Sequence, residues 1–129
     1  MQGYIQVYTG NGKGKTTAAL GLTLRAVGAG LRVFIAQFVK GMKYSELDAI
    51  RLLGENVTLN QYGRDCFIYN DPEPADIAIA RQGLTAARTA MLSGKYDILI
   101  LDEANIAVYY NLFSIDALLE FIDRKPENV

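Results

Sequence analysis

The chain has 129 residues, half of them hydrophobic, and its 13 Lys and Arg against 14 Asp and Glu give a formal net charge of −1. This length allows one globular domain with a single layered core, and the near-neutral charge favours a small-molecule ligand over nucleic acid. One cysteine excludes an internal disulfide, and the lack of histidine excludes the common zinc sites and Ser-His-Asp catalysis.

From the N-terminus onward, short β-branched and aromatic runs alternate with longer helical patterns, which predicts βαβ units and a mainly parallel sheet. The first residues lack the pattern of a signal peptide, and no apolar run approaches the roughly 20 residues needed to cross a bilayer, so we expect a cytoplasmic protein without membrane contact. The expected strands are residues 4–8, 31–38, 57–61 and 97–101. The expected helices are residues 15–27, 45–53, 74–92 and 114–123.

Two of these strands, 31–38 and 97–101, are almost continuously apolar, which predicts that they lie at the centre of the sheet. Residues 62–73 are irregular, polar and aromatic, so we expect a functional or covering loop there. Residues 124–129 resemble a helix stop followed by the first residue of another strand. We therefore expect either that the protein continues beyond residue 129 or that it is a shortened variant whose sheet edge is protected in some other way.

The strongest chemical signal is a glycine-rich segment between the first expected strand and the first expected helix. Its spacing matches the phosphate-binding pattern G-x-x-x-x-G-K-[ST], except that the first position is Thr9. Backbone amides and a helix N-terminus attract phosphate in such a loop, where Lys15 would contact phosphate oxygens and the Thr16 hydroxyl would bind Mg²⁺. An ordinary turn could contain the same glycines, but the flanking elements favour the phosphate site. The candidate nucleotide-binding residues are Thr9, Gly10, Asn11, Gly12, Lys13, Gly14, Lys15, Thr16 and Thr17.

The second signal is the apolar strand 97–101, which is followed by Asp102 and Glu103. A strand that ends in two carboxylates is common, and by itself it is often only a solvated strand end. Together with the glycine-rich loop, it predicts a magnesium nucleotide site in which one of the two carboxylates holds Mg²⁺, directly or through water, while the other orients the reacting group. We therefore expect residues 1–129 to form a single three-layer α/β domain of the P-loop NTPase type, lacking its C-terminal strand.

Several segments of the sequence are similar to those of the P-loop ATP:corrinoid adenosyltransferases of cobalamin biosynthesis and salvage. They are residues 10–19, 25–28 and 37–41, together with Asp102, Glu103 and Asn105. The most specific parts are the extra Lys13 within the loop and the Gln-Phe-x-Lys-Gly segment at 37–41. Members of this family usually continue into a further strand with a Thr-Gly-Arg-like turn.

This resemblance implies that Co(I) of a reduced corrinoid attacks the 5′ carbon of ATP and expels triphosphate. Lys13, Lys15, the loop amides and Mg²⁺ would then stabilise the leaving group, which requires no histidine base. The resemblance makes Thr16 and Glu103 the candidate magnesium ligands, with Asp102 behind them, and Lys15 and Glu103 the candidate catalytic residues. Arg25 matches a family arginine that would contact the nucleotide, but on an apolar helix it could equally be an ion-pair partner or a surface residue. The family also implies a reduced flavoprotein such as flavodoxin as electron donor, and its members are often homodimers.

A corrinoid is a broad apolar plate, so its site should present aromatic surface. The sequence places candidate rings in two segments: Tyr62, Phe67, Tyr69, Tyr109, Tyr110 and Phe113. Phe67 and Tyr69 align with a Phe-x-Trp pair that helps to displace the lower cobalt ligand in similar proteins, but Tyr69 departs from the Trp: it keeps an aromatic face and adds a hydroxyl. Each ring could instead bury a loop against the core.

Other readings of the same residues stay open. Gln37 and Lys40 either contact nucleotide or corrinoid or solvate a strand end, and Cys66 is interpreted as a small filler residue. The competing functions are a P-loop ATPase or kinase that releases ADP, with Glu103 positioning water or the acceptor, and a non-catalytic module that binds MgATP without turnover.

Overall fold

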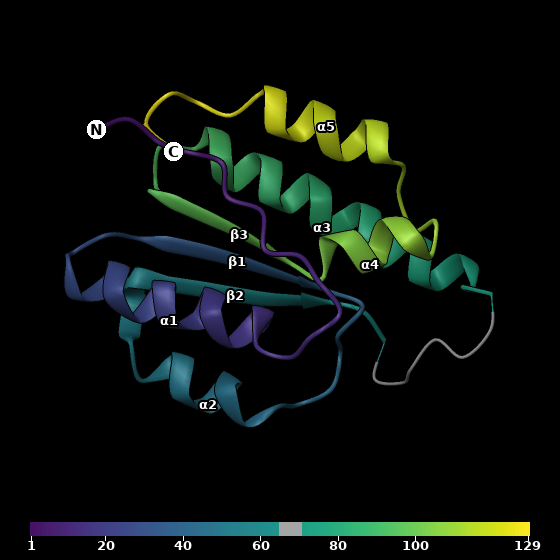
Figure 1. Cartoon of the computed structure of the whole chain (residues 1–129), viewed down its shortest axis with the longest axis horizontal. Helices are drawn as coiled ribbons and strands as arrows, with labels where there is room; N and C mark the ends of the chain where they lie inside the picture. The colour runs from purple at the N-terminus through teal and green to yellow at the C-terminus, as the bar shows by residue number, and fades with distance from the viewer. Residues whose placement is uncertain (65–70) are drawn as a thin grey trace.

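The computed structural model describes residues 1–64 and 71–129. Within these residues, three strands form a parallel sheet in the order β2-β1-β3. Their bounds are Val33–Phe38 for β1, Val57–Tyr62 for β2 and Ile98–Asp102 for β3. In the pairing register Gln37 of β1 lies opposite both Gln61 of β2 and Asp102 of β3. The carboxyl ends of the strands therefore meet at one edge of the sheet (Figure 1).

Helices cover both faces of this sheet, which confirms the expected three-layer α/β architecture (Figure 1). One face carries α1 and α2, and the other carries α3, α4 and α5. None of the helices in the described ranges is long and apolar enough to span a membrane. The helices are α1 (Lys15–Gly28), α2 (Ser45–Arg51), α3 (Pro74–Leu92), α4 (Ala104–Tyr109) and α5 (Ile115–Asp123), with a 3₁₀ turn η1 (Gly54–Asn56) before β2.

Local capping explains where the two main helices of the second face begin. At α3, Glu73 and Asp76 form a reciprocal capping box, and Pro74 stands at the first helical position, where its missing N–H costs nothing. At α5, the Ser114 hydroxyl accepts a hydrogen bond from the Ala117 amide at 3.1 Å. These caps satisfy amides that a helix start leaves unpaired, so local sequence fixes both helix starts.

Alternating side chains of β1 build two separate parts of the core. Phe34, Ala36 and Phe38 belong to the larger cluster beneath α3, α4 and α5, whereas Val33 and Ile35 pack toward α1. All six residues of β1 are buried, which confirms its expected central position. Burial on both faces also explains why the sequence of this strand is almost continuously apolar.

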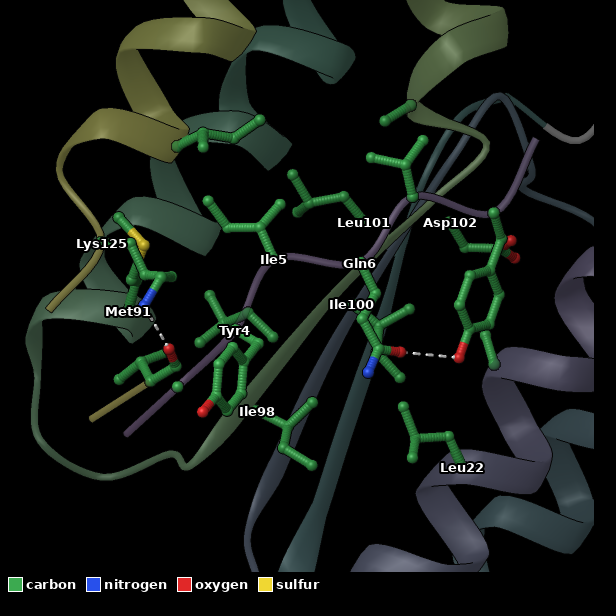
Figure 2. A pocket seen from close by; sticks show the side chains of 18 of the residues that line it. Tyr4, Ile5, Gln6, Leu22, Met91, Ile98, Ile100, Leu101, Asp102 and Lys125 are labelled. Carbon is green, nitrogen blue, oxygen red and sulfur yellow. Dashed lines mark hydrogen bonds between the residues drawn. The ribbon is translucent and has the colours of Figure 1, made fainter. Parts of the chain in front are cut away.

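The predicted strand at residues 4–8 is wrong. These residues run beside β3 in Figure 1 but form no strand, and Tyr4 is 76% exposed. A cavity of about 460 Å³ lies between this segment and β3, lined by residues 1–8 and by the whole of the strand (Figure 2). The start of the segment is tied elsewhere, because the Gly3 amide donates to the Glu127 carbonyl at 2.7 Å. The segment thus has the local pattern of a strand but forms no ladder with β3, its neighbour across the cavity.

This arrangement also corrects the expected position of the strand 97–101. Observed as β3, it forms an edge of the described sheet, and its first four residues are only partly buried, because residues 4–8 do not pair with it.

Other differences are smaller: the strand expected at 31–38 begins at Val33, and the helix expected at 45–53 ends at Arg51. In the first case the Leu31 amide still closes the end of α1 by bonding to the Ala26 carbonyl at 2.9 Å. In the second, the chain turns at Gly54, where φ is +73°.

The sequence analysis missed α4, a helix of six residues directly after β3. Its start is unusual, because Glu103 adopts a left-handed conformation with φ of 63°. A helix this short carries little periodic signal of its own, and the turn that starts it depends on the strand before it.

Candidate functional site

The glycine-rich loop leads into α1 as predicted. Gly10 and Gly14 have φ of 133° and 108°, a conformation that side chains disfavour, so glycine is required at both positions. Among the described residues, no side chain caps the start of α1, and its first turn contains no acidic residue. The amides and the positive end of the helix dipole are therefore available to an anion, as a phosphate site requires.

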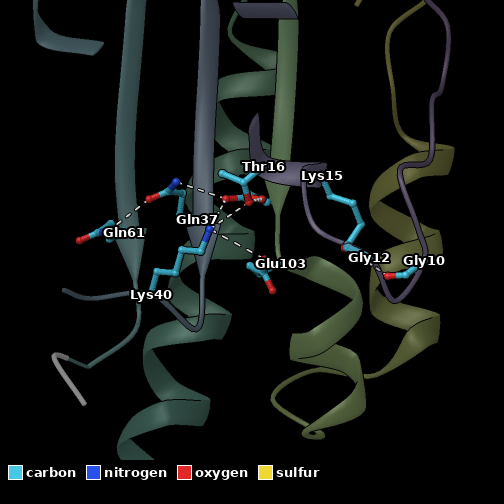
Figure 3. A network of polar contacts seen from close by, with 9 residues as sticks. Gly10, Gly12, Lys15, Thr16, Gln37, Lys40, Gln61 and Glu103 are labelled. Carbon is cyan, nitrogen blue, oxygen red and sulfur yellow. Dashed lines mark hydrogen bonds and ion pairs between the residues drawn. The ribbon is translucent and has the colours of Figure 1, made fainter. Parts of the chain in front are cut away.

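Lys15 is folded back onto this loop. Its Nζ donates to the carbonyls of Gly10 and Gly12 at 2.6 Å each (Figure 3). The ammonium group thus closes the loop and stands beside the glycines that would surround a phosphate. Phosphate oxygens could replace these carbonyl acceptors with little movement of the side chain.

The carboxylate of Asp102, at the end of β3, brings together residues from three elements. Its Oδ1 accepts from Thr16 Oγ1 at 2.9 Å, and its Oδ2 accepts from Gln37 Nε2 at 3.2 Å and from Lys40 Nζ at 2.8 Å. Asp102 is only 8% exposed. The fold therefore joins the first turn of α1 to a buried carboxylate 86 residues away in the sequence.

Lys40 is the cation at the centre of this group. Besides its bond to Asp102, Nζ donates to Thr16 Oγ1 at 3.0 Å and lies 3.8 Å from Glu103 Oε1 (Figure 3). Sequence analysis placed Lys40 at a strand end with an open role, and the structure places it against all three candidate magnesium ligands. We call Thr16, Asp102 and Glu103 the oxygen cluster. The Lys40 ammonium group lies against all three of these residues.

Two glutamines extend this network across the sheet. Gln61 Nε2 donates to Gln37 Oε1 at 3.2 Å (Figure 3), and it also donates to the Met42 carbonyl at 2.9 Å. Gln37 is fully buried, so its amide needs these partners. Gln61 was not singled out from the sequence, but the parallel register of the strands could have indicated it, because Gln37, Gln61 and Asp102 occupy one row.

The backbone beside the oxygen cluster is strained and closely packed. Val39 has φ of 64°, which is rare for a β-branched residue, and Glu103 has a similar left-handed conformation. A Cβ at Gly63 would lie 2.6 Å from the Val39 carbonyl carbon, so the loops that follow β1 and β2 touch through backbone. The positions of Lys40 and Glu103 therefore depend on turns that the surrounding fold enforces.

A separate ion pair joins Arg64, which follows the end of β2, to the start of α3. Arg64 donates from Nε to Asp76 Oδ1 at 2.6 Å and from Nη2 to Oδ2 at 2.9 Å, and its Nη1 also contacts Glu73 Oε2 at 3.1 Å. The hydrogen bond from Arg64 is the main cause that lowers the pKa of Asp76 below its ordinary value of 3.8, against the opposing effect of burial. The sequence analysis missed this pair, which ties the start of α3 to the end of β2.

The remaining predicted residues are distributed as follows. Phe67, Tyr69 and Cys66 lie outside the described residues. Arg25 is exposed in the last turn of α1, about 15 Å along the helix from the phosphate loop at 1.5 Å per residue, so the fold does not bring it to the loop.

The aromatic residues have different environments. Tyr62 is buried against Gly83 and Phe38, and Phe113 makes an edge-to-face contact with Phe38 at 5.2 Å between ring centroids. These two rings are core residues. Tyr109 is 79% exposed and meets the Tyr110 ring edge-on at 5.4 Å. Of the described rings, Tyr109 therefore presents the most surface to a ligand.

The donor set of the oxygen cluster suits Mg²⁺. It offers two carboxylates and a hydroxyl, which are hard oxygen ligands, and a protein cation already stands among them. Among the described residues no group of three or more His, Cys, Asp or Glu could enclose a metal. Mg²⁺ would therefore share its coordination between Thr16, a carboxylate and phosphate oxygens, as is usual at nucleotide sites.

Comparison with known proteins points to one family. The whole chain, residues 1–129, matches the family described as ATP:corrinoid adenosyltransferase BtuR/CobO/CobP. It is 31% identical to the corrinoid adenosyltransferase of Pseudomonas aeruginosa, over 97% of this chain and 62% of that protein. It is 32% identical to the corrinoid adenosyltransferase of Escherichia coli, over 97% of this chain and 63% of that protein. An uncharacterised protein of Nostoc sp. is 37% identical over 96% of this chain, which spans 36% of that protein.

Proposed function

The chain belongs to the ATP:corrinoid adenosyltransferase family, and from this premise we propose that it transfers the 5′-deoxyadenosyl group of ATP to Co(I) of a reduced corrinoid. Triphosphate is the second product, and the reaction serves cobalamin biosynthesis or salvage. The observation that supports the proposal is the hydrogen bond from Thr16 to Asp102 at 2.9 Å, because it joins the start of α1 to the carboxylate at the end of β3, as a magnesium nucleotide site would require. The chain spans about 62% of the length of the Pseudomonas relative, so the activity is proposed on family and site together.

The reaction balances without a nucleophile from the protein. The electron pair of the Co(I) substrate forms the new bond to the 5′ carbon, and the carbon–oxygen bond breaks with its electron pair on the triphosphate. The oxygen that leaves carries its charge away, so no proton transfer is needed. A chain without histidine is compatible with this chemistry, because the leaving group requires only neutralisation of its charge.

The residues of the phosphate loop supply that neutralisation. Lys15 would exchange the carbonyls of Gly10 and Gly12 for phosphate oxygens, while Lys13 and the amides of the loop contribute further positive potential. Mg²⁺, when bound, would neutralise part of the triphosphate charge. Thr16 and Glu103 would hold it, and Asp102 would accept from Thr16 and so fix the orientation of its hydroxyl.

The corrinoid side of the site rests on the resemblance alone. We propose Phe67 and Tyr69 as the rings that meet the corrinoid. A reduced flavoprotein donor and a homodimer complete the proposal for partners.

The test is an anaerobic incubation of the chain with MgATP and chemically reduced Co(I) corrinoid, with the full-length Pseudomonas relative as positive control. The corrinoid spectrum and the phosphate products are followed together. A light-sensitive alkylated corrinoid with intact triphosphate is the expected result. Release of ADP and phosphate would show an ATPase or kinase instead, and nucleotide binding without any turnover would show a binding module. Either of these two results would overturn the proposed transfer.

A further inference from the structure

We propose that Lys40 acts as a resident counter-cation that competes with Mg²⁺ for the oxygen cluster. Bare Mg²⁺ then binds weakly, and a triphosphate allows it to enter by offering Lys40 other oxygens. This inference rests on the proposed function, because it takes magnesium triphosphate as the ligand. It assigns to Lys40 a positioning role that controls which form of the nucleotide the site accepts.

The contacts of Lys40 are those that a bound cation would make. Its Nζ lies 2.8 Å from Asp102 Oδ2, 3.0 Å from Thr16 Oγ1 and 3.8 Å from Glu103 Oε1. The side chains of Lys40, Asp102 and Glu103 are 18%, 8% and 21% exposed, so water screens these charges only partly. A divalent ion at the same oxygens would lie within a few ångströms of the ammonium group. At that distance two positive charges repel strongly, because the partly buried site screens them less than bulk water does.

The fold holds Lys40 in this place through features that a free surface lysine lacks. The residue follows Val39, whose left-handed backbone is strained, and that turn is packed against the backbone of Gly63. Gln37 donates to the same carboxylate oxygen as Lys40 and receives a hydrogen bond from Gln61. Strain of this kind persists where the surrounding structure enforces it, often at functional sites.

The side chain can nevertheless leave its place. Lysine ends in a compact charge on a flexible four-carbon stem, so the ammonium can move to phosphate oxygens while its backbone stays fixed. The phosphate loop ends at Lys15, directly before Thr16, which already contacts Lys40. A triphosphate bound at this loop would bring new acceptors to the same neighbourhood.

The experiment is a titration of the folded chain with Mn²⁺, without nucleotide or corrinoid, followed by electron paramagnetic resonance of the free ion. Wild type is compared with Lys40→Met and Lys40→Arg at one pH and ionic strength. Lys43→Met is the matched control, because Lys43 lies in the same loop, is 70% exposed and pairs with Asp48 instead. We expect Lys40→Met to tighten Mn²⁺ binding at least tenfold, and Lys40→Arg and Lys43→Met to stay within twofold of wild type.

Further variants test whether the Mn²⁺ ion that Lys40→Met binds lies at the oxygen cluster. Adding Asp102→Asn to Lys40→Met should abolish the increase in Mn²⁺ affinity, because it removes the carboxylate that both Lys40 and the metal ion would contact. If Lys40→Met does not fold by circular dichroism, Lys40→Gln, which keeps a hydrogen-bond donor, is measured in its place. Equal Mn²⁺ affinities of wild type and the Lys40 variant would overturn the proposal, and so would an equal gain in Lys43→Met. Because neither ATP nor corrinoid is present, this result is independent of whether adenosyl transfer is observed.

Discussion

Lys15 illustrates how a single side chain can serve the ligand more than the fold. Its ammonium group bonds only to the carbonyls of its own loop in the contacts described above, so its removal should cost little stability. Hydrogen bonds between charged groups are worth about 1.5–3 kcal/mol, which corresponds to roughly ten- to hundredfold in affinity. We therefore expect Lys15→Ala to weaken MgATP binding by that factor in isothermal titration calorimetry. Lys43→Ala, at an exposed site, is the control, and equal affinities for MgATP in the two variants would contradict the phosphate role of Lys15.

Asp76 provides a second residue-scale prediction, this time on stability and pH. Asp76→Asn removes a charged partner of Arg64 and should lower the free energy of unfolding by about 2 kcal/mol at neutral pH. The pKa of Asp76 is lowered in the folded chain, so its stabilisation is complete well above pH 3.8 and is lost as the pH falls toward the folded pKa. In urea unfolding, the difference between wild type and variant should be constant from about pH 6 to 8 and shrink below about pH 4. A difference that persists unchanged in acid would show that the ion pair is not its source.

At the scale of secondary-structure elements, two helical glycines with opposite surroundings make a matched pair. A Cβ at Gly83 of α3 would stand 2.5 Å from Tyr62 Cγ, whereas a Cβ at Gly21 of α1 would meet nothing within 4 Å. Overpacking typically costs about 1–3 kcal/mol, while alanine is better than glycine by about 1 kcal/mol within a helix. We expect Gly83→Ala to lower the thermal midpoint and Gly21→Ala to raise it. The same sign in both variants would mean that helix propensity, not the contact between α3 and β2, decides the outcome.

Element boundaries show how far local sequence reaches. Helices α1, α3 and α5 were predicted within a residue at each end, because a glycine turn, a capping box and a serine cap mark their starts locally. Residues 4–8 were predicted as a strand but form none, because a strand needs a pairing partner. Helix α4 was not predicted, because it begins after Glu103, whose left-handed conformation the local sequence does not indicate. Pairing between distant segments has no counterpart in a local pattern.

At the scale of the whole molecule, the candidate site couples α1 to β1 and β3. A ligand that binds only the folded chain stabilises it, by about 2.7 kcal/mol at a concentration one hundred times its Kd. For a domain of this size, that corresponds to a rise of roughly 10 °C in the thermal midpoint. We expect such a rise with saturating MgATP in differential scanning fluorimetry, and a much smaller one with ATP in excess EDTA. An identical rise under both conditions would argue against a metal role for Thr16, Asp102 and Glu103.

The sequence by itself determined the layered α/β fold, the phosphate loop, the candidate magnesium ligands and the family. The first three depend on short-range chemistry: the spacing of glycines around Lys15, an apolar strand that ends in carboxylates, and hydrophobic periodicity. The family was indicated by the resemblance of several segments, among them residues 10–19 and 37–41. Only the tertiary structure decided that Lys40 stands among the candidate magnesium ligands, that Gln61 reaches the candidate site through Gln37, and that Arg64 pairs with Asp76. It also decided that Tyr62 and Phe113 are core residues. Each of these contacts joins residues from different elements, so it exists only once strand register and helix packing have placed both partners.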